Sequence, residues 1–178
     1  FAAILIGSFT TVSSQTTAKV QIIHNSADIV SQNVDVYVNG KMFLDDFKFR
    51  TATPFVEIPG NTPLEIEIIP QSDNQETIEF GWNQNLTFKA GESYILVANG
   101  LLSQNRYNNF KAFDVYPFAG ARESAKSNPS QASTDVLVFH GSTDAPVVDV
   151  WESNLVGAEV IDNLNYGDFS GYLSLPTN

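Results

Sequence analysis

The stretch VQIIHNSADIVSQNVDVYVNG, from Val20 to Gly40, decides the fold because a close copy of it recurs later in the chain. VQIIHNSAD (Val20–Asp28) returns as VLVFHGSTD (Val136–Asp144), and NVDVYV (Asn33–Val38) returns as VVDVWE (Val147–Glu152). The two histidines of the chain, His24 and His140, stand at the same place in the two copies. Such matched spacing indicates an internal repeat, which has to be recognised before a fold is assigned.

The repeat divides the chain into two copies joined by a linker. We assign residues 19–118 to the first copy, residues 119–134 to a linker without large apolar side chains, and residues 135–178 to the second copy. Asn178 aligns with Asn61 of the first copy, so we expect the second copy to be incomplete and the natural protein to continue. Beyond Lys126 the sequence has acidic residues and no Lys or Arg, which makes the second copy the more anionic one.

The first residues are typical of an export signal. Residues 1–15 begin with an apolar run, Phe1–Phe9, and continue with small hydroxylated residues, among which Val12 and Ser14 fit a signal-peptidase site. This run is too short to span a bilayer, which requires about 20 apolar residues. We therefore expect the remnant of a signal peptide at 1–15, an exported protein and no transmembrane span, with a first core strand as the alternative.

Alternation of apolar and polar residues predicts an all-β fold. Val34, Val36 and Val38 alternate with polar or amphipathic residues, as expected of a strand with one wet face, and no window has a sustained helical stripe. Asn39-Gly40 suits the positive φ values of a type I′ turn, which predicts a hairpin. The other expected strands cover residues 19–24, 53–58, 64–68, 86–88, 93–99 and 110–116.

This density of short strands favours a tandem antiparallel β-sandwich, immunoglobulin-like or prealbumin-like, with an incomplete second copy. The formal net charge of −11 makes nucleic acid an unexpected partner. The absence of cysteine excludes disulfides and thiolate chemistry within this sequence. Neither a G-x-S-x-G nor an H-E-x-x-H motif is present, so no catalytic residue is assigned.

The order of motifs resembles that of the bacterial family catalogued as domain of unknown function 4397, which has H-x-S-x-D-A-P, V-D-V-Y-V-N-G, F-x-x-x-T-P-Y and V-P-A-G in sequence. The resemblance covers Val20–Phe118 and, through HGSTDAPVVDVW, the second copy. Two places depart from the pattern, Ala27-Asp28-Ile29 in the first copy and Glu152-Ser153-Asn154 in the second. The resemblance implies a secreted or surface protein, often with tandem copies, and no particular activity.

Histidines and aspartates at repeated positions are the candidate metal ligands. His24, Asp28 and Asp35 in the first copy, and His140, Asp144 and Asp149 in the second, could form a metal or proton-transfer cluster. We favour a structural interpretation, in which each imidazole is hydrogen-bonded to the following loop and the aspartates cap turns. No cofactor is expected, although calcium could bind loop carboxylates of so acidic a chain.

Aromatic residues in polar stretches suggest a second kind of contact. Trp82 and Tyr107 lie in Asn-rich segments, where flat rings can stack on a sugar or anchor a partner. Trp151 stands at the repeat position of Tyr37, and we expect it to pack against the protein itself.

Three functions remain open from the sequence. The first is a non-catalytic, exported module of the cell surface or extracellular space with a structural, adhesive or ligand-binding role, whose partner could be a polysaccharide, a protein or another component of the cell envelope. The second is a secreted hydrolase that acts through clustered carboxylates. The third is a calcium-dependent adhesion module.

Overall fold

The computed structural model describes residues 16–71, 81–103, 106–108, 111–126, 133–153 and 157–176. The expected signal-peptide remnant, residues 1–15, lies outside the described residues, as does part of the linker. The described chain is all-β apart from one short 3-10 turn, η1 (Ile29–Ser31). It contains no helix long and apolar enough to cross a membrane.

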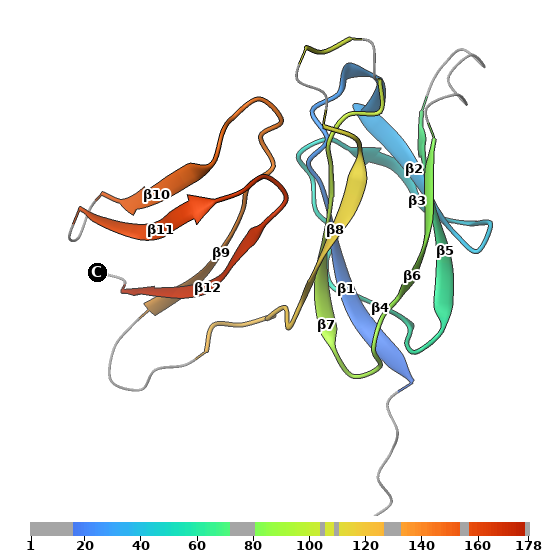
Figure 1. Cartoon of the computed structure of the whole chain (residues 1–178). Coiled ribbons are helices and arrows are strands. Elements are labelled where there is room, and N and C mark those ends of the chain that lie inside the picture. The colour runs from blue at the N-terminus through green and yellow to red at the C-terminus, as the bar shows by residue number, and fades with distance from the viewer. Residues whose placement is uncertain are drawn as a thin grey trace, which may run out of the picture.

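Two four-stranded sheets face one another in the first unit, residues 16–126 (Figure 1). One sheet has the order β4-β1-β7-β8 and the other has the order β3-β2-β5-β6. The strands are β1 (Thr17–His24), β2 (Asn33–Val38), β3 (Lys41–Lys48), β4 (Val56–Pro59), β5 (Pro63–Pro70), β6 (Trp82–Thr87), β7 (Ser93–Asn99) and β8 (Asp114–Ala119). The all-β sandwich expected from the sequence is confirmed.

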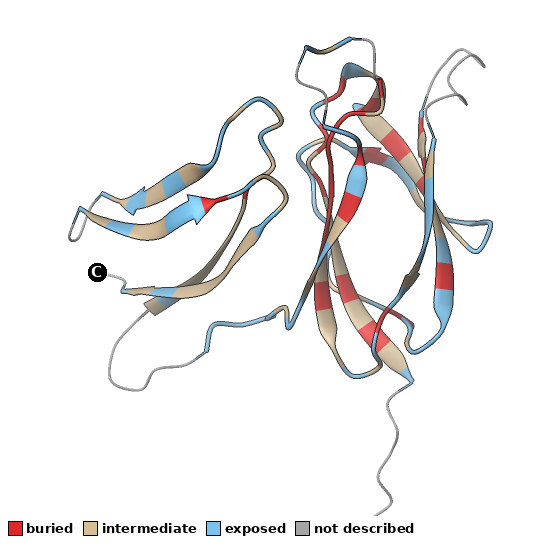
Figure 2. Ribbon diagram, in the orientation of Figure 1, coloured by how far each residue is buried: buried red, intermediate tan, exposed pale blue. Residues whose placement is uncertain are grey.

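The core lies between these sheets and is formed by alternate residues of their strands. Val20, Val34 and Leu64 are each 1% exposed and belong to one apolar cluster. Burial of this cluster accounts for the period-two pattern of the sequence, because successive side chains of a strand point to opposite faces. Figure 2 shows the buried positions gathered in the first unit.

The expected hairpin is also confirmed. Asn39 and Gly40 have φ values of 51° and 70°, and they connect β2 to β3. Two irregularities in register follow the turn, one between Tyr37 and Val36 and one between Val36 and Val34. Asp46, at the second of these, has a φ of 53°, and its N–H donates to Asp35 Oδ1 at 2.9 Å. A bulge of this kind bends the strand and increases its twist.

Two details differ from the sequence prediction. The sheets are not wholly antiparallel, because β7 pairs with β1 in parallel, from Lys19 opposite Ser93 to His24 opposite Ala98. The last strand of the first unit begins at Asp114 and runs through Pro117 to Ala119, whereas we expected it to end before the proline. Proline is tolerated there because β8 is an edge strand and does not need every N–H group for pairing.

The second unit, residues 133–176, contains two two-stranded sheets, β12-β9 and β10-β11. Its strands are β9 (Ser133–Phe139), β10 (Val148–Glu152), β11 (Ala158–Leu164) and β12 (Phe169–Pro176). Both pairs resemble pairs of the first unit. The β9–β12 pair is antiparallel, as the β1–β4 pair is. The β10–β11 pair has two register shifts, as the β2–β3 pair has. The interpretation of this unit as an incomplete sandwich remains a prediction.

Aromatic rings join the two units. Tyr116 and Phe118 of β8 contact rings of the second unit: Phe139 at 5.3 Å, Phe169 at 5.2 Å and Tyr172 at 5.6 Å between centroids. Arg122 reinforces this surface by lying 4.3 Å above the Tyr172 ring. Val97 of β7 is 3% exposed but is not part of the sandwich core, and Asn99, two residues further on, donates to the Gly141 carbonyl oxygen of the second unit at 3.1 Å.

We predict that core truncation and surface truncation have very different effects. Leu64→Ala should lower the free energy of unfolding by about 2–5 kcal/mol, because it removes a fully buried side chain and leaves a cavity. Met42→Ala, at a position that is 53% exposed, should change it by no more than about 0.5 kcal/mol. Urea unfolding measures both values, and a similar loss in the two variants would contradict the placement of the core.

Candidate functional site

A cluster of buried polar side chains closes the end of the sandwich at which β1 ends. It combines residues of the β1–β2 connection with residues at the end of β7 and beyond it. Each of these polar residues is at most 2% exposed: His24, Ser26, Asp28, Ser31, Asn99 and Ser103. Among the described residues, no buried side-chain nitrogen or oxygen lacks a hydrogen-bond partner. We call this set the polar cluster.

Asp28 is the charged member of the polar cluster and is 0% exposed. Its carboxylate accepts hydrogen bonds from Ser103 N at 2.7 Å, Ser103 Oγ at 2.7 Å, Tyr107 Oη at 3.2 Å and Val30 N at 3.2 Å. Burial acts to raise the pKa of Asp28, but these donors outweigh burial and hold the pKa below its ordinary value. The carboxylate is therefore stabilised by four donor groups and is closed to solvent.

The His24 ring is also buried and hydrogen-bonded within the protein. Its Nε2 lies 2.7 Å from the Ser31 carbonyl oxygen, and Ser26 N donates to Nδ1 at 3.4 Å. The ring also contacts those of Phe47 and Phe49, at 5.8 Å and 6.0 Å between centroids. Burial lowers the pKa of His24, and the Ser31 carbonyl opposes this shift only in part. The arrangement favours a neutral imidazole that donates from Nε2.

In the second unit, His140 has the same environment as His24, but Asp144 does not have the environment of Asp28. His140 Nε2 lies 2.8 Å from the Pro146 carbonyl oxygen, and Ser142 N donates to Nδ1 at 3.4 Å, as Ser26 does to His24. His140 is 5% exposed. Asp144, by contrast, is exposed and accepts a hydrogen bond from Ser142 Oγ at 2.9 Å.

The candidate metal ligands named from the sequence have separate hydrogen-bond partners in the structure. His24 and Asp28 have separate partners, and Asp35 accepts from the hairpin at Asp46 N. Among the described residues, one group of carboxylates has ligand atoms within 4.8 Å of one another, namely Asp149, Glu159 and Asp162. All three are exposed, and Asp149 Oδ1 already accepts from Asn163 N at 2.8 Å.

Sequence reasoning found Asp149 but missed its neighbours, although both lie on the strand that pairs with it. The pKa of Glu159 is raised, first by partial desolvation of this exposed carboxylate and then by the nearby charges of Asp149 and Asp162. Crowded like charges of this kind disfavour ionisation, and a cation between them would relieve the repulsion.

The candidate stacking residues have structural partners. Trp82 is half-buried and lies edge-on to Phe113, with ring centroids 5.9 Å apart. Tyr107 uses its hydroxyl to donate to Asp28 Oδ1 and to accept from Ile29 N. Trp151, expected to pack against the protein, is instead 61% exposed, so that expectation is wrong. Among the described residues, β10 pairs only with β11, whereas β2 pairs with both β3 and β5.

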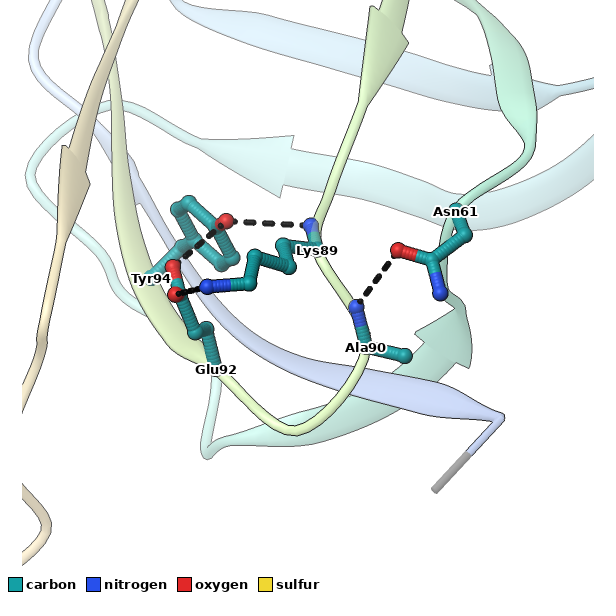
Figure 3. A network of polar contacts seen from close by, with 5 residues as sticks. All are labelled: Asn61, Lys89, Ala90, Glu92 and Tyr94. Carbon is teal, nitrogen blue, oxygen red and sulfur yellow. Dashed lines mark hydrogen bonds and ion pairs between the residues drawn. The ribbon is translucent and has the colours of Figure 1, made fainter. Parts of the chain in front are cut away.

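The opposite end of the sandwich, where β1 begins, is also polar but open. Lys89 Nζ donates to Glu92 Oε1 at 2.7 Å, and Tyr94 Oη donates to Glu92 Oε2 at 3.1 Å (Figure 3). Asn61 accepts from Ala90 N at 3.1 Å in the same turn. The hydrogen bond from Lys89 lowers the pKa of Glu92, and the hydrogen bond from Tyr94 adds a smaller effect in the same direction. These contacts fix the β6–β7 turn beside a cleft of about 260 Å³ that Lys19, Glu57 and Glu123 help to line.

The fold and the polar cluster define a class of protein: a β-sandwich whose ionisable groups at one end are closed by its own loops. The family model described as Domain of unknown function (DUF4397) matches residues 18–119, and the chain belongs to this family. No curated protein and no solved structure matches the chain.

The two equivalent aspartates provide a matched test of the polar cluster. Asp28→Asn should lower the free energy of unfolding by about 2 kcal/mol or more, because it removes a charged acceptor and turns an amide N–H₂ toward buried donors. Asp144→Asn should change it by no more than about 0.5 kcal/mol, since this carboxylate is exposed. Chemical denaturation of both variants measures the difference, and equal effects would contradict it.

The lowered pKa of His24 predicts a pH dependence. The unfolded chain binds a proton on this residue at a higher pH than the folded chain does. The stability that neutral His24 contributes is complete above its ordinary pKa of 6.5 and is lost as the pH falls from there toward the lowered value. Asp28 acts in a separate window, below its ordinary pKa of 3.8.

His24→Gln should flatten the plot of the free energy of unfolding against pH just below pH 6.5. The reason is that Gln can still donate to Ser31 but does not titrate. The measurement is the free energy of unfolding between pH 7 and pH 5. The matched variant His140→Gln should keep the pH dependence of the free energy of unfolding that His24 causes. An unchanged slope in His24→Gln would refute the assignment.

Proposed function

We propose that the chain is a non-catalytic, exported module that acts at the cell surface or outside the cell in a structural, adhesive or ligand-binding role. The polar cluster is the observation that carries this proposal. Two of the candidate metal or proton-transfer groups, His24 and Asp28, are 0% exposed and engaged in hydrogen bonds within the protein. Groups held in this way stabilise a fold and do not reach a substrate.

Two further features support the proposal. The aromatic contacts between the units favour a stiff two-unit module, which suits a structural or adhesive role. The apolar run Phe1–Phe9 supports export. Within a binding role, the exposed ring of Trp151 is better suited to stacking on a sugar than Trp82, which packs on Phe113.

The two rival functions depend on other residues. A hydrolase or a calcium-dependent adhesin would use the exposed carboxylates Asp149, Glu159 and Asp162. A hydrolase would release soluble products from envelope polysaccharide, and an adhesin would lose binding when calcium is chelated. Both rivals can therefore be separated from the proposed role in one assay.

We predict that the chain sediments with isolated envelope polysaccharide, releases no soluble sugar and is unaffected by a calcium chelator. Trp151→Ala should weaken this retention by about 10-fold, as expected for loss of an exposed aromatic anchor. Met42→Ala, also an exposed apolar position, is the control and should bind normally. Product release that stops in Glu159→Gln would establish the hydrolase instead, and loss of binding on chelation would establish the adhesin.

A further inference from the structure

The outer face of the β3-β2-β5-β6 sheet carries side chains that the fold itself does not use. The other sheet of the first unit contacts the second unit through β8, whereas this sheet lies on the side away from the second unit (Figure 1). All four of its strands lie within residues 18–119, which the family model matches. This face is therefore a feature of the matched domain and does not depend on the second unit.

Three strands contribute to one row of outward side chains. Tyr37 of β2 stands opposite Glu67 of β5, and Glu67 stands opposite Asn83 of β6. Their neighbours Val36 and Ile68 are 3% exposed and belong to the core, so the row itself points outward. Asn83 is exposed, and Tyr37 and Glu67 are partly exposed. Because adjacent strands lie about 4.8 Å apart, the row is roughly 10 Å long.

An acid of β5 stands opposite an amide of β6 a second time. Glu65 pairs with Asn85, two residues along both strands, and both side chains are exposed. Carboxylates accept hydrogen bonds, and amides both donate and accept them. The face thus presents one flat ring beside two pairs of polar groups.

Tyr37 differs from the other tyrosines of the chain. The other five use their hydroxyls in hydrogen bonds within the protein, namely Tyr94, Tyr107, Tyr116, Tyr166 and Tyr172. Within the described part of the chain, no ring contact or side-chain hydrogen bond involves Tyr37, Glu67 or Asn83. The ring and the polar groups of this row are therefore available to a ligand.

We propose that this outer face binds a neutral polysaccharide, with a sugar ring stacked on Tyr37 and sugar hydroxyls bonded to Glu67 and Asn83. The inference rests on the proposed ligand-binding role and names its site and its class of ligand. An aromatic ring offers a flat apolar surface to the C–H face of a sugar, and the carboxylate and the amide supply the directional bonds. Met42 stands opposite Tyr37 on the edge strand β3 and lies outside the row.

Charge selects the neutral ligand. The ionisable groups at the outward positions of β2 and β5 are the carboxylates Asp35, Glu65 and Glu67, so an anionic polysaccharide would be repelled. A flat protein surface would bury Glu67 without a cation, which is costly. A sugar instead provides hydroxyl donors to the same carboxylate. An aromatic residue also stands at this repeat position in both copies, as Tyr37 and Trp151, as expected of a shared class of ligand.

Affinity electrophoresis of the full chain tests the inference. Native gels contain β-glucan, mannan or galactan as neutral polysaccharides, or alginate as an anionic one. At least one neutral polysaccharide should retard the chain, and alginate should not. In the gel that retards it, Tyr37→Ala should weaken binding by about 10-fold or more, both in the original chain and in Trp151→Ala. Tyr37→Trp should retain binding.

Matched variants separate the site from the fold. Glu67→Ala and Asn83→Ala should each weaken binding, whereas Glu57→Ala, which removes an exposed carboxylate from the other sheet, should bind as the original chain does. Urea unfolding shows which variants remain folded. A folded Tyr37→Ala or Glu67→Ala that binds as strongly as the original chain would overturn the site.

The outcomes also distinguish this inference from the function on which it rests. Retardation that is unaffected by the row variants would overturn the site and leave the ligand-binding role intact. Retardation by alginate alone, or by none of the gels, would overturn the inference, and sedimentation with envelope polysaccharide would then decide the binding role separately. An oligolysine peptide that binds in place of every neutral polysaccharide would show instead that the face docks a basic polypeptide.

Discussion

A carboxylate buried without a cation needs several hydrogen-bond donors, and this requirement organises the first unit. Asp28 obtains two of its donors from Ser103, which is 75 residues away in the sequence. The bonds tie the β1–β2 connection to the segment that follows β7. Because β1 and β7 belong to one sheet and β2 belongs to the other, Asp28 holds the two sheets together at this end. Ser26 strengthens the closure by donating to the Gly100 carbonyl oxygen at 2.7 Å.

Features that depend on neighbouring residues could be predicted from the sequence, and those that depend on distant ones could not. The β2–β3 hairpin follows from Asn39-Gly40, and β7 follows from the short apolar run within Ser93–Asn99, which begins after the Ala90-Gly91 turn. The parallel pairing of β1 with β7 is invisible locally, because period-two alternation is the same in parallel and antiparallel strands. Ser103 carried no signal in the sequence, since a serine in a loop has no pattern that assigns it to one aspartate.

The contact between the units did leave a signal in the sequence. A strand covered on both faces is apolar at nearly every position, and β7 contains the run YILVA. In the second unit, Leu137 and Phe139 stand where β1 has Gln21 and Ile23, so its outer face is more apolar than that of the first copy. These differences between the copies correspond to the surface that the Tyr116 and Phe118 rings contact.

The two units agree where the structure is local and differ where it depends on added strands. Asp46 and Asn163 both have positive φ, and each donates its N–H to the aspartate across its hairpin, Asp35 or Asp149. Both residue types tolerate this conformation because short polar side chains can bond locally. The hairpin therefore has the same local geometry in both units. Asp28, Val34 and Val36 are buried beside the β5–β8 segment, whereas in the described structure Asp144 is exposed and Val148 and Val150 are half-buried.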